Sequence, residues 1–324
     1  MRDHGVMRIA LAALIIVLAG PATASAAPSV GGCPVFPPSN PWNQLVTKRA
    51  GDSHSARIIK AQAAGHELHL DFGSTEEEYG IPFSIVDASQ ALLPLSFGVD
   101  DENYADESDR GPVPVPADAR IEGGNAADRD PDEGDRHVIT ITRGSCTLTE
   151  LYHAERVRRD GKVVGWRASA AARWSLRSNK LRPATWTSAD AAGLPIFPGL
   201  LRYEEAASGT IQHAIRFTLP RARAAYIAPA RHCGPGEDPS LPAYGTRLRL
   251  KRSFSEKPYR GPLKAIVVAM KRYGLMFADQ GSAMYVTGTS DPRWAATIDQ
   301  LREHPIDGSQ FEVVRPAGRL SVCR

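Results

Sequence analysis

Apolar and polar residues alternate along much of the chain, and this two-residue period is typical of half-buried β-strands. The alternation predicts strands over 66–72, 81–86, 92–97, 137–143, 147–157, 162–168, 210–219 and 224–230. Asp160-Gly161 is a turn dipeptide that predicts a hairpin into the strand at 162–168. A further hairpin is predicted from 275–278 and 282–287, with Asp279-Gln280-Gly281 as its turn. In that position, turn chemistry accounts for Asp279.

Helical spacing is confined to fewer segments. Residues 261–273 place Leu263, Ile266, Val267 and Met270 on one face and end before Gly274. Shorter helices are predicted over 55–64, 188–192 and 203–208. Strands outnumber helices, so we expect a mainly β protein with a β-sandwich or jelly-roll-like core and a few peripheral helices. An α+β fold is the alternative.

The first twenty-six residues have the three-part order of a secretory signal peptide. Arg2 and Arg8 charge the start, 9–20 is apolar, and Ala24-Ser25-Ala26 is an A-x-A cleavage site. We therefore predict a signal peptide over 1–26 and a secreted, extracellular protein. An extended arm rich in Pro and Asn follows over 27–50, and 51–324 is expected to form a single globular domain.

The composition excludes some classes of partner. The formal net charge is only +3 for 324 residues, whereas a nucleic-acid-binding protein normally carries a strong basic excess. No apolar run after the predicted signal approaches the ~20 residues of a membrane span. We therefore expect neither a nucleic-acid partner nor a membrane span.

Four cysteines, Cys33, Cys146, Cys233 and Cys323, follow the predicted signal. An even number in an exported chain predicts two disulfides, for which the sequence allows three pairings. We favour Cys33 with Cys323, which would join the termini, and Cys146 with Cys233. None of the four has the spacing of a zinc site.

Residues 100–135 differ in character from the rest of the chain. They contain thirteen Asp or Glu residues against three Arg, with prolines at 112, 114 and 116. Such a composition predicts an acidic loop excursion that buries no core, either as a solvated segment or as a loop of a site.

The end of this stretch resembles an oxygen-ligand loop for calcium, with Asp128, Asp130 and Asp132 in alternation. Glu133 occupies the position where an EF-hand has glycine, and Ile139 the position of its last ligand. Structural calcium is therefore one interpretation, and a solvated acidic segment is the other. No cofactor is required by any motif: P-loop, G-x-G-x-x-G, G-x-S-x-G and H-E-x-x-H are all missing from the sequence.

The densest group of candidate catalytic residues also lies in this stretch. Cleavage of a glycosidic bond requires a carboxylic acid and a carboxylate, which Asp106 and Glu107 could supply, with Glu122 as a distant partner. Asp109 is a candidate for substrate binding. The competing interpretation is an exposed acidic loop without a catalytic role.

Two histidines are candidate catalytic residues as well. His213 lies in Ile211-Gln212-His213-Ala214-Ile215, where a strand would place it on an apolar face, and a satisfied core histidine is the competing interpretation. His232 follows a predicted strand, beside Cys233.

Further residues are candidates for binding substrate. They are His137, which could also act as the base of a lyase, Arg216 and Arg231, which suit an acidic sugar, and Trp186, which could stack on a sugar ring.

Several segments resemble a family of exported bacterial proteins for which no activity is established. They are 36–43, 104–109, 135–137, 186–195, 213–218 and 229–232. The likeness extends over nearly the whole chain after the predicted signal, which implies one domain. It implies no catalytic role for any residue.

Two functions from different classes fit these features. The first is a secreted carbohydrate-active enzyme, a glycoside hydrolase or alternatively a polysaccharide lyase, acting on an extracellular polysaccharide. The second is a non-catalytic module of the cell envelope that binds glycan or protein. Convergence of the candidate carboxylates and histidines on one cleft would favour the enzyme.

Overall fold

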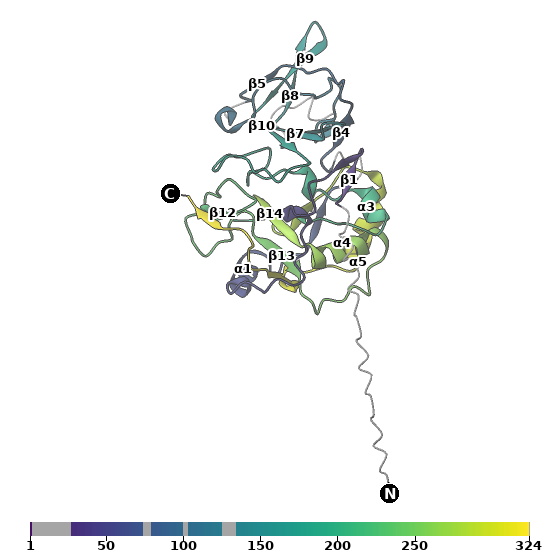
Figure 1. The fold of residues 1–324 in the computed structure, drawn as a ribbon, viewed down its shortest axis with the longest axis vertical. Coiled ribbons are helices and arrows are strands. Elements are labelled where there is room, and N and C mark those ends of the chain that lie inside the picture. The colour runs from purple at the N-terminus through teal and green to yellow at the C-terminus, as the bar shows by residue number, and fades with distance from the viewer. Residues whose placement is uncertain (2–26, 74–78, 100–102, 125–133, 324) are drawn as a thin grey trace.

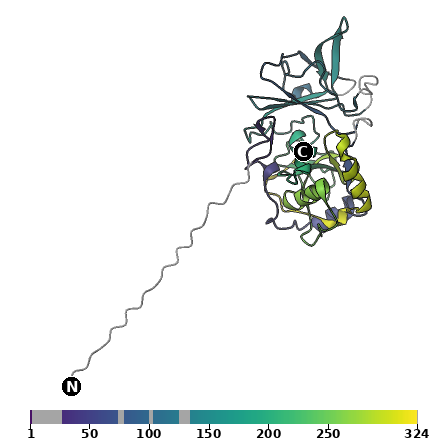
Figure 2. The same cartoon turned by 90° about the vertical axis from the view of Figure 1, so that its right-hand side faces the viewer.

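Two groups of β-strands, one above the other in Figures 1 and 2, form the body of the protein. The structure is a computed structural model that describes Met1 and residues 27–73, 79–99, 103–124 and 134–323. Helices gather around the lower group of strands (Figure 2). The prediction of a mainly β protein with few helices is confirmed, and the strands form several sheets that mix parallel and antiparallel pairs.

The seventeen strands of the described residues are short, as the many turns in the sequence imply. They are β1 (Ser29–Val30), β2 (Cys33–Pro34), β3 (His69–Asp71), β4 (Phe83–Val86), β5 (Leu95–Phe97), β6 (Val138–Thr142), β7 (Thr147–Tyr152), β8 (Glu155–Arg159), β9 (Lys162–Ala168), β10 (Ala170–Ser175), β11 (Ile215–Leu219), β12 (Ala225–Ile227), β13 (Arg247–Leu250), β14 (Leu275–Gln280), β15 (Tyr285–Thr287), β16 (Phe311–Val313) and β17 (Leu320–Val322). The helices are α1 (Ser55–Gln62), α3 (Tyr203–Ala207), α4 (Gly261–Arg272) and α5 (Ala295–Glu303).

The upper group holds a four-stranded sheet in the order β10-β7-β6-β4 and a three-stranded sheet in the order β5-β9-β8. The predicted hairpin at Asp160-Gly161 joins β8 to β9. Ile139 and Ile141 on β6 and Leu148 on β7 belong to the largest core cluster, which also includes residues of the lower group. One core therefore connects the two groups.

The lower group is a six-stranded sheet in the order β16-β13-β14-β11-β15-β3. Here β11 pairs in parallel with β14 and antiparallel with β15, so it lies between them. The predicted hairpin of β14 and β15 is therefore wrong, because an apolar strand from elsewhere in the chain separates them. Helix α4 packs against β13 with the buried face that its sequence predicts.

The described part of the acidic stretch contributes to a second core. Val113 and Val115 are fully buried, and Ala119 and Ile121 pack in the same cluster as Trp166. The expectation that 100–135 buries no core is wrong for this part, because its valines alternate with prolines and one face of the segment packs inward. Trp166 Nε1 donates a hydrogen bond to the carbonyl oxygen of Val115 at 3.3 Å, which fixes the segment on the sheet.

Two disulfides are present, as the cysteine count predicts, but the favoured pairing is wrong. Cys33 is joined to Cys146, and Cys233 to Cys323. The N-terminal arm lies against the four-stranded sheet, whereas the C-terminal strand β17 pairs with β12. Each bridge therefore fixes a different part of the chain, and the pair is consistent with an oxidising compartment such as the extracellular space.

Residues 188–192 form an irregular loop with a bend and a turn in place of the predicted helix. Ser188 Oγ accepts a hydrogen bond from Asp190 N at 3.0 Å and donates to Leu194 O at 2.6 Å. These bonds within the loop replace the helical pattern, as serine often does near turns. Among the described residues, no helix is long and apolar enough to cross a membrane.

Candidate functional site

A cavity of about 380 Å³, which we call the central cavity, lies between the two groups of strands. Tyr152 on β7 lines it from the upper group, and Asp279 and Gln280 on β14 line it from the lower group. Its other walls include Asp135, His137, Thr187, Ser188, His232 and Tyr244. The cavity thus brings together residues that lie far apart in the sequence.

Arg216 on the interior strand β11 organises the carboxylates of this region. Its Nε donates to Asp190 Oδ2 at 2.7 Å and its Nη2 to Asp279 Oδ2 at 3.0 Å. Its Nη1 donates to Thr287 Oγ1 at 2.9 Å. These contacts follow from the sheet order, because β11 is flanked by β14, which carries Asp279, and by β15, which carries Thr287.

One positive guanidinium therefore faces two carboxyl groups and cannot neutralise both if both are ionised. The pKa values of the two aspartates are raised accordingly. Burial raises the pKa of Asp279, the charge of Arg216 opposes this rise, and the charges of Asp190 and Asp135 add to it. The result is a pKa well above the usual range of an aspartate, at about 7. Burial likewise raises the pKa of Asp190, which is only 1% exposed. The pair of carboxyl groups thus retains a proton close to neutral pH, and Asp279 is the member of the pair that lines the cavity.

His137 forms a second charged pair at the wall of the cavity. Its Nδ1 lies 2.5 Å from Glu122 Oε2, and its Nε2 lies 2.9 Å from the carbonyl oxygen of Ala189. Burial alone would lower the pKa of His137, but the charge and hydrogen bond of Glu122, with the charge of Asp135, raise it to about 9. Both ring nitrogens face acceptors, so the ring is a protonated imidazolium that donates on both sides.

One cluster among the described residues has side chains of the types that bind metal ions. It consists of Glu122, Asp135 and His137, whose candidate ligand atoms lie within 4.8 Å of one another. The geometry of His137 does not fit this role. A metal ligand must present a nitrogen lone pair, whereas both nitrogens of His137 donate to oxygen acceptors. We therefore interpret the group as an ion pair beside the exposed carboxylate of Asp135.

Glu107 and His232 meet at the edge of the central cavity. His232 Nε2 lies 4.0 Å from Glu107 Oε2, and its Nδ1 lies 2.9 Å from the carbonyl oxygen of Ala191. Glu107 Oε2 also accepts a hydrogen bond from Thr187 N at 2.7 Å. Both side chains are about one-third exposed, so they remain accessible to a ligand.

Glu150 on β7 fixes the segment that follows this wall. It is fully buried, and its two carboxylate oxygens accept hydrogen bonds from Ile196 N at 3.0 Å and Phe197 N at 2.8 Å. Burial raises the pKa of Glu150 to about 7, although the two backbone donors oppose the rise. The upper sheet thereby holds the 187–197 segment in place against the lower sheet.

The structure brings together some of the predicted site residues. His137 and His232 line the central cavity, and Glu107 lies next to His232 at its edge. Two further candidates bind residues that line the cavity: Glu122 binds His137, and Arg216 binds Asp279. Arg216 is buried and bound to carboxylates, so its place is to position Asp279 and not to bind an acidic sugar directly.

Two predicted catalytic residues lie elsewhere. The side chain of Asp106 is 99% exposed and pairs with Arg110 at 2.8 Å. His213 is fully buried ahead of β11, where its Nε2 lies 2.9 Å from Glu205 Oε1 and 3.0 Å from Arg202 Nη2. His213 is thus the satisfied core histidine of the competing interpretation. Of the four catalytic candidates Asp106, Glu107, His213 and His232, only Glu107 and His232 meet at the central cavity.

The remaining candidates occupy different surroundings. Asp109 binds Arg182 at 2.5 Å, and Arg231 Nε donates to the carbonyl oxygen of Arg182 at 2.9 Å. Trp186 lines a neighbouring groove. The predicted calcium ligands Asp128, Asp130 and Asp132 lie outside the described residues.

The residues that sequence reasoning missed are Asp190, Asp279 and Asp135. The turn predicted at 279–281 accounts for Asp279 locally, whereas in the structure Asp279 lies on β14, and the pairing of β14 with β11 brings it to Arg216. A signal was present in Arg216 itself, because an arginine on a buried strand requires a carboxylate partner.

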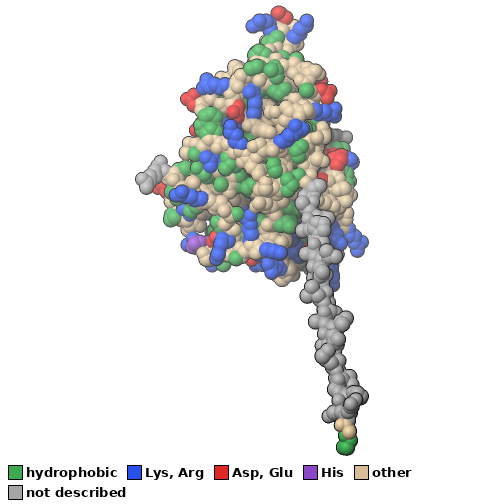
Figure 3. Space-filling model, viewed as in Figure 1, with side chains coloured by type: hydrophobic (Ala, Val, Ile, Leu, Met, Phe, Trp, Pro, Cys, Tyr) green, Lys and Arg blue, Asp and Glu red, His purple; other side chains and the backbone are tan. Residues whose placement is uncertain are grey.

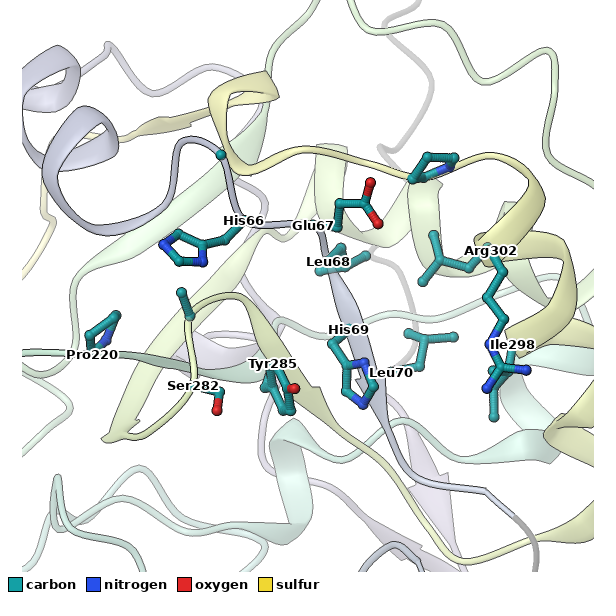
Figure 4. Close-up of a pocket in the computed structure, with 14 residues that line it drawn as sticks. His66, Glu67, Leu68, His69, Leu70, Pro220, Ser282, Tyr285, Ile298 and Arg302 are labelled. Atoms are coloured by element: carbon teal, nitrogen blue, oxygen red, sulfur yellow. The ribbon is translucent and has the colours of Figure 1, made fainter.

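A second cavity, of about 620 Å³, lies between β3, the loop before β15 and helix α5 (Figure 4). His69 and Tyr285 stack there with ring centroids 4.1 Å apart. Among the described residues that line it, Glu67 is the one carboxylate. The central cavity, with two carboxylates, is the better candidate for chemistry that needs a carboxylate pair.

Comparison with protein-family models, curated proteins and solved structures finds no match, so geometry alone supports the function proposed below.

Proposed function

We propose that the protein is an exported glycoside hydrolase with its active site in the central cavity. One observation carries this proposal: Asp279, whose pKa is raised to about 7, and Asp135, which is exposed, line the same cavity. A glycosidase needs one carboxyl group that is protonated at working pH and a second that is ionised. The pKa of Asp279 is raised by its surroundings, whereas Asp135 is exposed to solvent.

In the proposed reaction, Asp279 gives its proton to the glycosidic oxygen as the bond from that oxygen to the anomeric carbon breaks. Asp135 supplies the second carboxyl group, as nucleophile or as base for the attacking water. Water completes the hydrolysis, and one new reducing end forms per bond cleaved. Arg216 positions Asp279, and Asp190 helps to keep the shared proton near neutral pH.

The alternatives have less support. A lyase needs a base to remove a sugar proton, and both ring nitrogens of His137, the histidine predicted for that task, are bound to oxygen acceptors. A pure binding module has no use for a carboxyl group with a strongly raised pKa, which costs stability at neutral pH. His232, at the edge of the cavity, is placed to contact substrate in either case.

The proposal is tested by measuring reducing ends released from a panel of neutral and acidic polysaccharides. Asp279→Asn and Asp135→Asn should each lower the rate on the cleaved polymer by about 100-fold or more, the usual contribution of acid–base catalysis. Asp106→Asn removes an exposed carboxylate outside the cavity and should retain full activity. Thermal unfolding of each variant verifies its fold. No cleavage of any polymer by the wild type, or equal activity of all three variants, would overturn the proposal.

A further inference from the structure

A groove of about 650 Å³ adjoins the central cavity. We call it the basic groove; its charged and aromatic residues are Asp109, Arg173, Trp174, Lys180, Arg182 and Trp186. Trp186 is followed directly by Thr187 and Ser188, which line the central cavity. Arg182 Nε donates to the carbonyl oxygen of Thr187 at 3.1 Å, so the two hollows share one wall.

The positive charge of the groove is only partly neutralised. Arg182 is paired with Asp109. The guanidinium of Arg173 donates to the carbonyl oxygens of 110, 111 and 112, which carry no net charge. Among the described residues, no carboxylate lies within ion-pair distance of Arg173 or Lys180, and Lys180 is exposed. The groove therefore presents two uncompensated cations.

Charge alone does not single out this place, because Lys and Arg side chains are spread over the whole face shown in Figure 3. The basic groove differs by its aromatic walls. The Arg182 guanidinium carbon lies 5.4 Å from the ring centre of Trp174 and 5.5 Å from that of Trp186. The buried Arg182 thus holds two indole rings in fixed positions at low entropic cost.

We propose that the basic groove binds an anionic polysaccharide and continues the substrate path of the central cavity. Ammonium and guanidinium groups bind carboxylate or sulfate substituents, while the apolar face of a sugar ring packs on indole. This inference rests on the proposed function and names its substrate class. A neutral glycan would leave the positive charges of Lys180 and Arg173 without a counter-ion.

The test measures binding of the full exported chain, carrying Asp279→Asn to prevent turnover, to polygalacturonate, dextran sulfate and uncharged dextran by affinity electrophoresis. Lys180→Gln should weaken binding to the anionic polymers about tenfold, the effect of one charge-assisted contact. Lys162→Gln removes the same charge at the exposed start of β9 and should leave binding unchanged. Trp186→Ala should also weaken binding, and added salt should weaken that of the parent chain.

Preferential binding of an anionic polymer that is lost in Lys180→Gln and retained in Lys162→Gln supports the inference, even if no polymer is cleaved. Equal binding of dextran, equal loss in both lysine variants, or tighter binding of single-stranded DNA than of either polymer would overturn it. Cleavage of neutral glycans without binding of anionic ones would overturn this inference while leaving the hydrolase proposal intact.

Discussion

The Nη2 atom of Arg216 lies 3.0 Å from Oδ2 of Asp279 on the neighbouring strand of the six-stranded sheet. The same guanidinium binds Asp190, so one buried cation stabilises two carboxylates at the boundary between the sheet and the central cavity. The fold and the proposed chemistry therefore depend on the same residue: Arg216 lies on the interior strand β11 and positions Asp279, the proposed acid.

Arg216→Leu should lower the free energy of unfolding by about 3–5 kcal/mol, because it leaves Asp190 buried without its counter-ion. Arg216→Lys should lose less, since it keeps the charge but not all three hydrogen bonds. Chemical denaturation measures both. Arg293→Leu removes an exposed arginine that also bridges two carboxylates and should change stability little. Equal effects at positions 216 and 293 would contradict this view of the network.

The stability of the protein should fall as pH rises through the alkaline range, in part because of His137. Its pKa in the fold is about 9, above the ordinary value of 6.5, so between these values the folded state binds more protons than the unfolded chain. Its stabilising contribution is complete below about pH 6.5 and is lost as pH rises through 9; it amounts to about 3 kcal/mol at most.

Melting temperatures at about pH 6.5 and pH 9.5 measure this loss. The difference should shrink in His137→Gln, which cannot carry the charge. His66→Gln, at an exposed histidine, should keep the wild-type difference. An unchanged difference in His137→Gln would show that the ring is not protonated in the fold.

Gly193 should tolerate no side chain. Its φ is +67°, and a Cβ there would lie 2.4 Å from the carbonyl oxygen of Trp186. Gly161 has φ +78° but nothing within 4 Å of a Cβ, so Gly161→Ala carries only the backbone strain of about 1–2 kcal/mol. Gly193→Ala should lose markedly more stability in the same denaturation experiment. Equal losses would mean that Gly193 does not lie against the carbonyl oxygen of Trp186.

The disulfide pairing can be read directly from peptides of the unreduced protein. Mass spectrometry should find Cys33 linked to Cys146 and Cys233 linked to Cys323. The first bridge spans 113 residues, and Cys146→Ser should lower the free energy of unfolding by about 2–5 kcal/mol. A peptide that links Cys33 to Cys323 would contradict the structure.

Local patterns in the sequence predict much of the secondary structure. The alternation at 162–168 and the helical spacing at 261–273 correspond to β9 and α4. The pattern cannot predict that β11 enters between β14 and β15, because strand order depends on contacts between distant segments. It also cannot predict the buried valines of 113 and 115, since each lies between prolines in a stretch without the alternation of a strand or the spacing of a helix.

The candidate site was predicted in part for the same reason. His232 and His137 were found by residue type and by their places at strand ends, and both line the central cavity. Asp279 was missed because its role depends on Arg216, sixty-three positions away in the sequence. Residues whose function arises from long-range pairing leave little signal in their own neighbourhood.

The pH dependence of polysaccharide cleavage tests the central claim most directly. With Asp279 as the acid, kcat/KM on the polymer that the wild type cleaves should fall as pH rises, with its midpoint near 7. Asp279→Asn should lose this activity, while Asp106→Asn should follow the wild-type curve. A wild-type rate that stays constant from about pH 6 to pH 9, or an Asp279→Asn variant with the wild-type curve, would contradict the account.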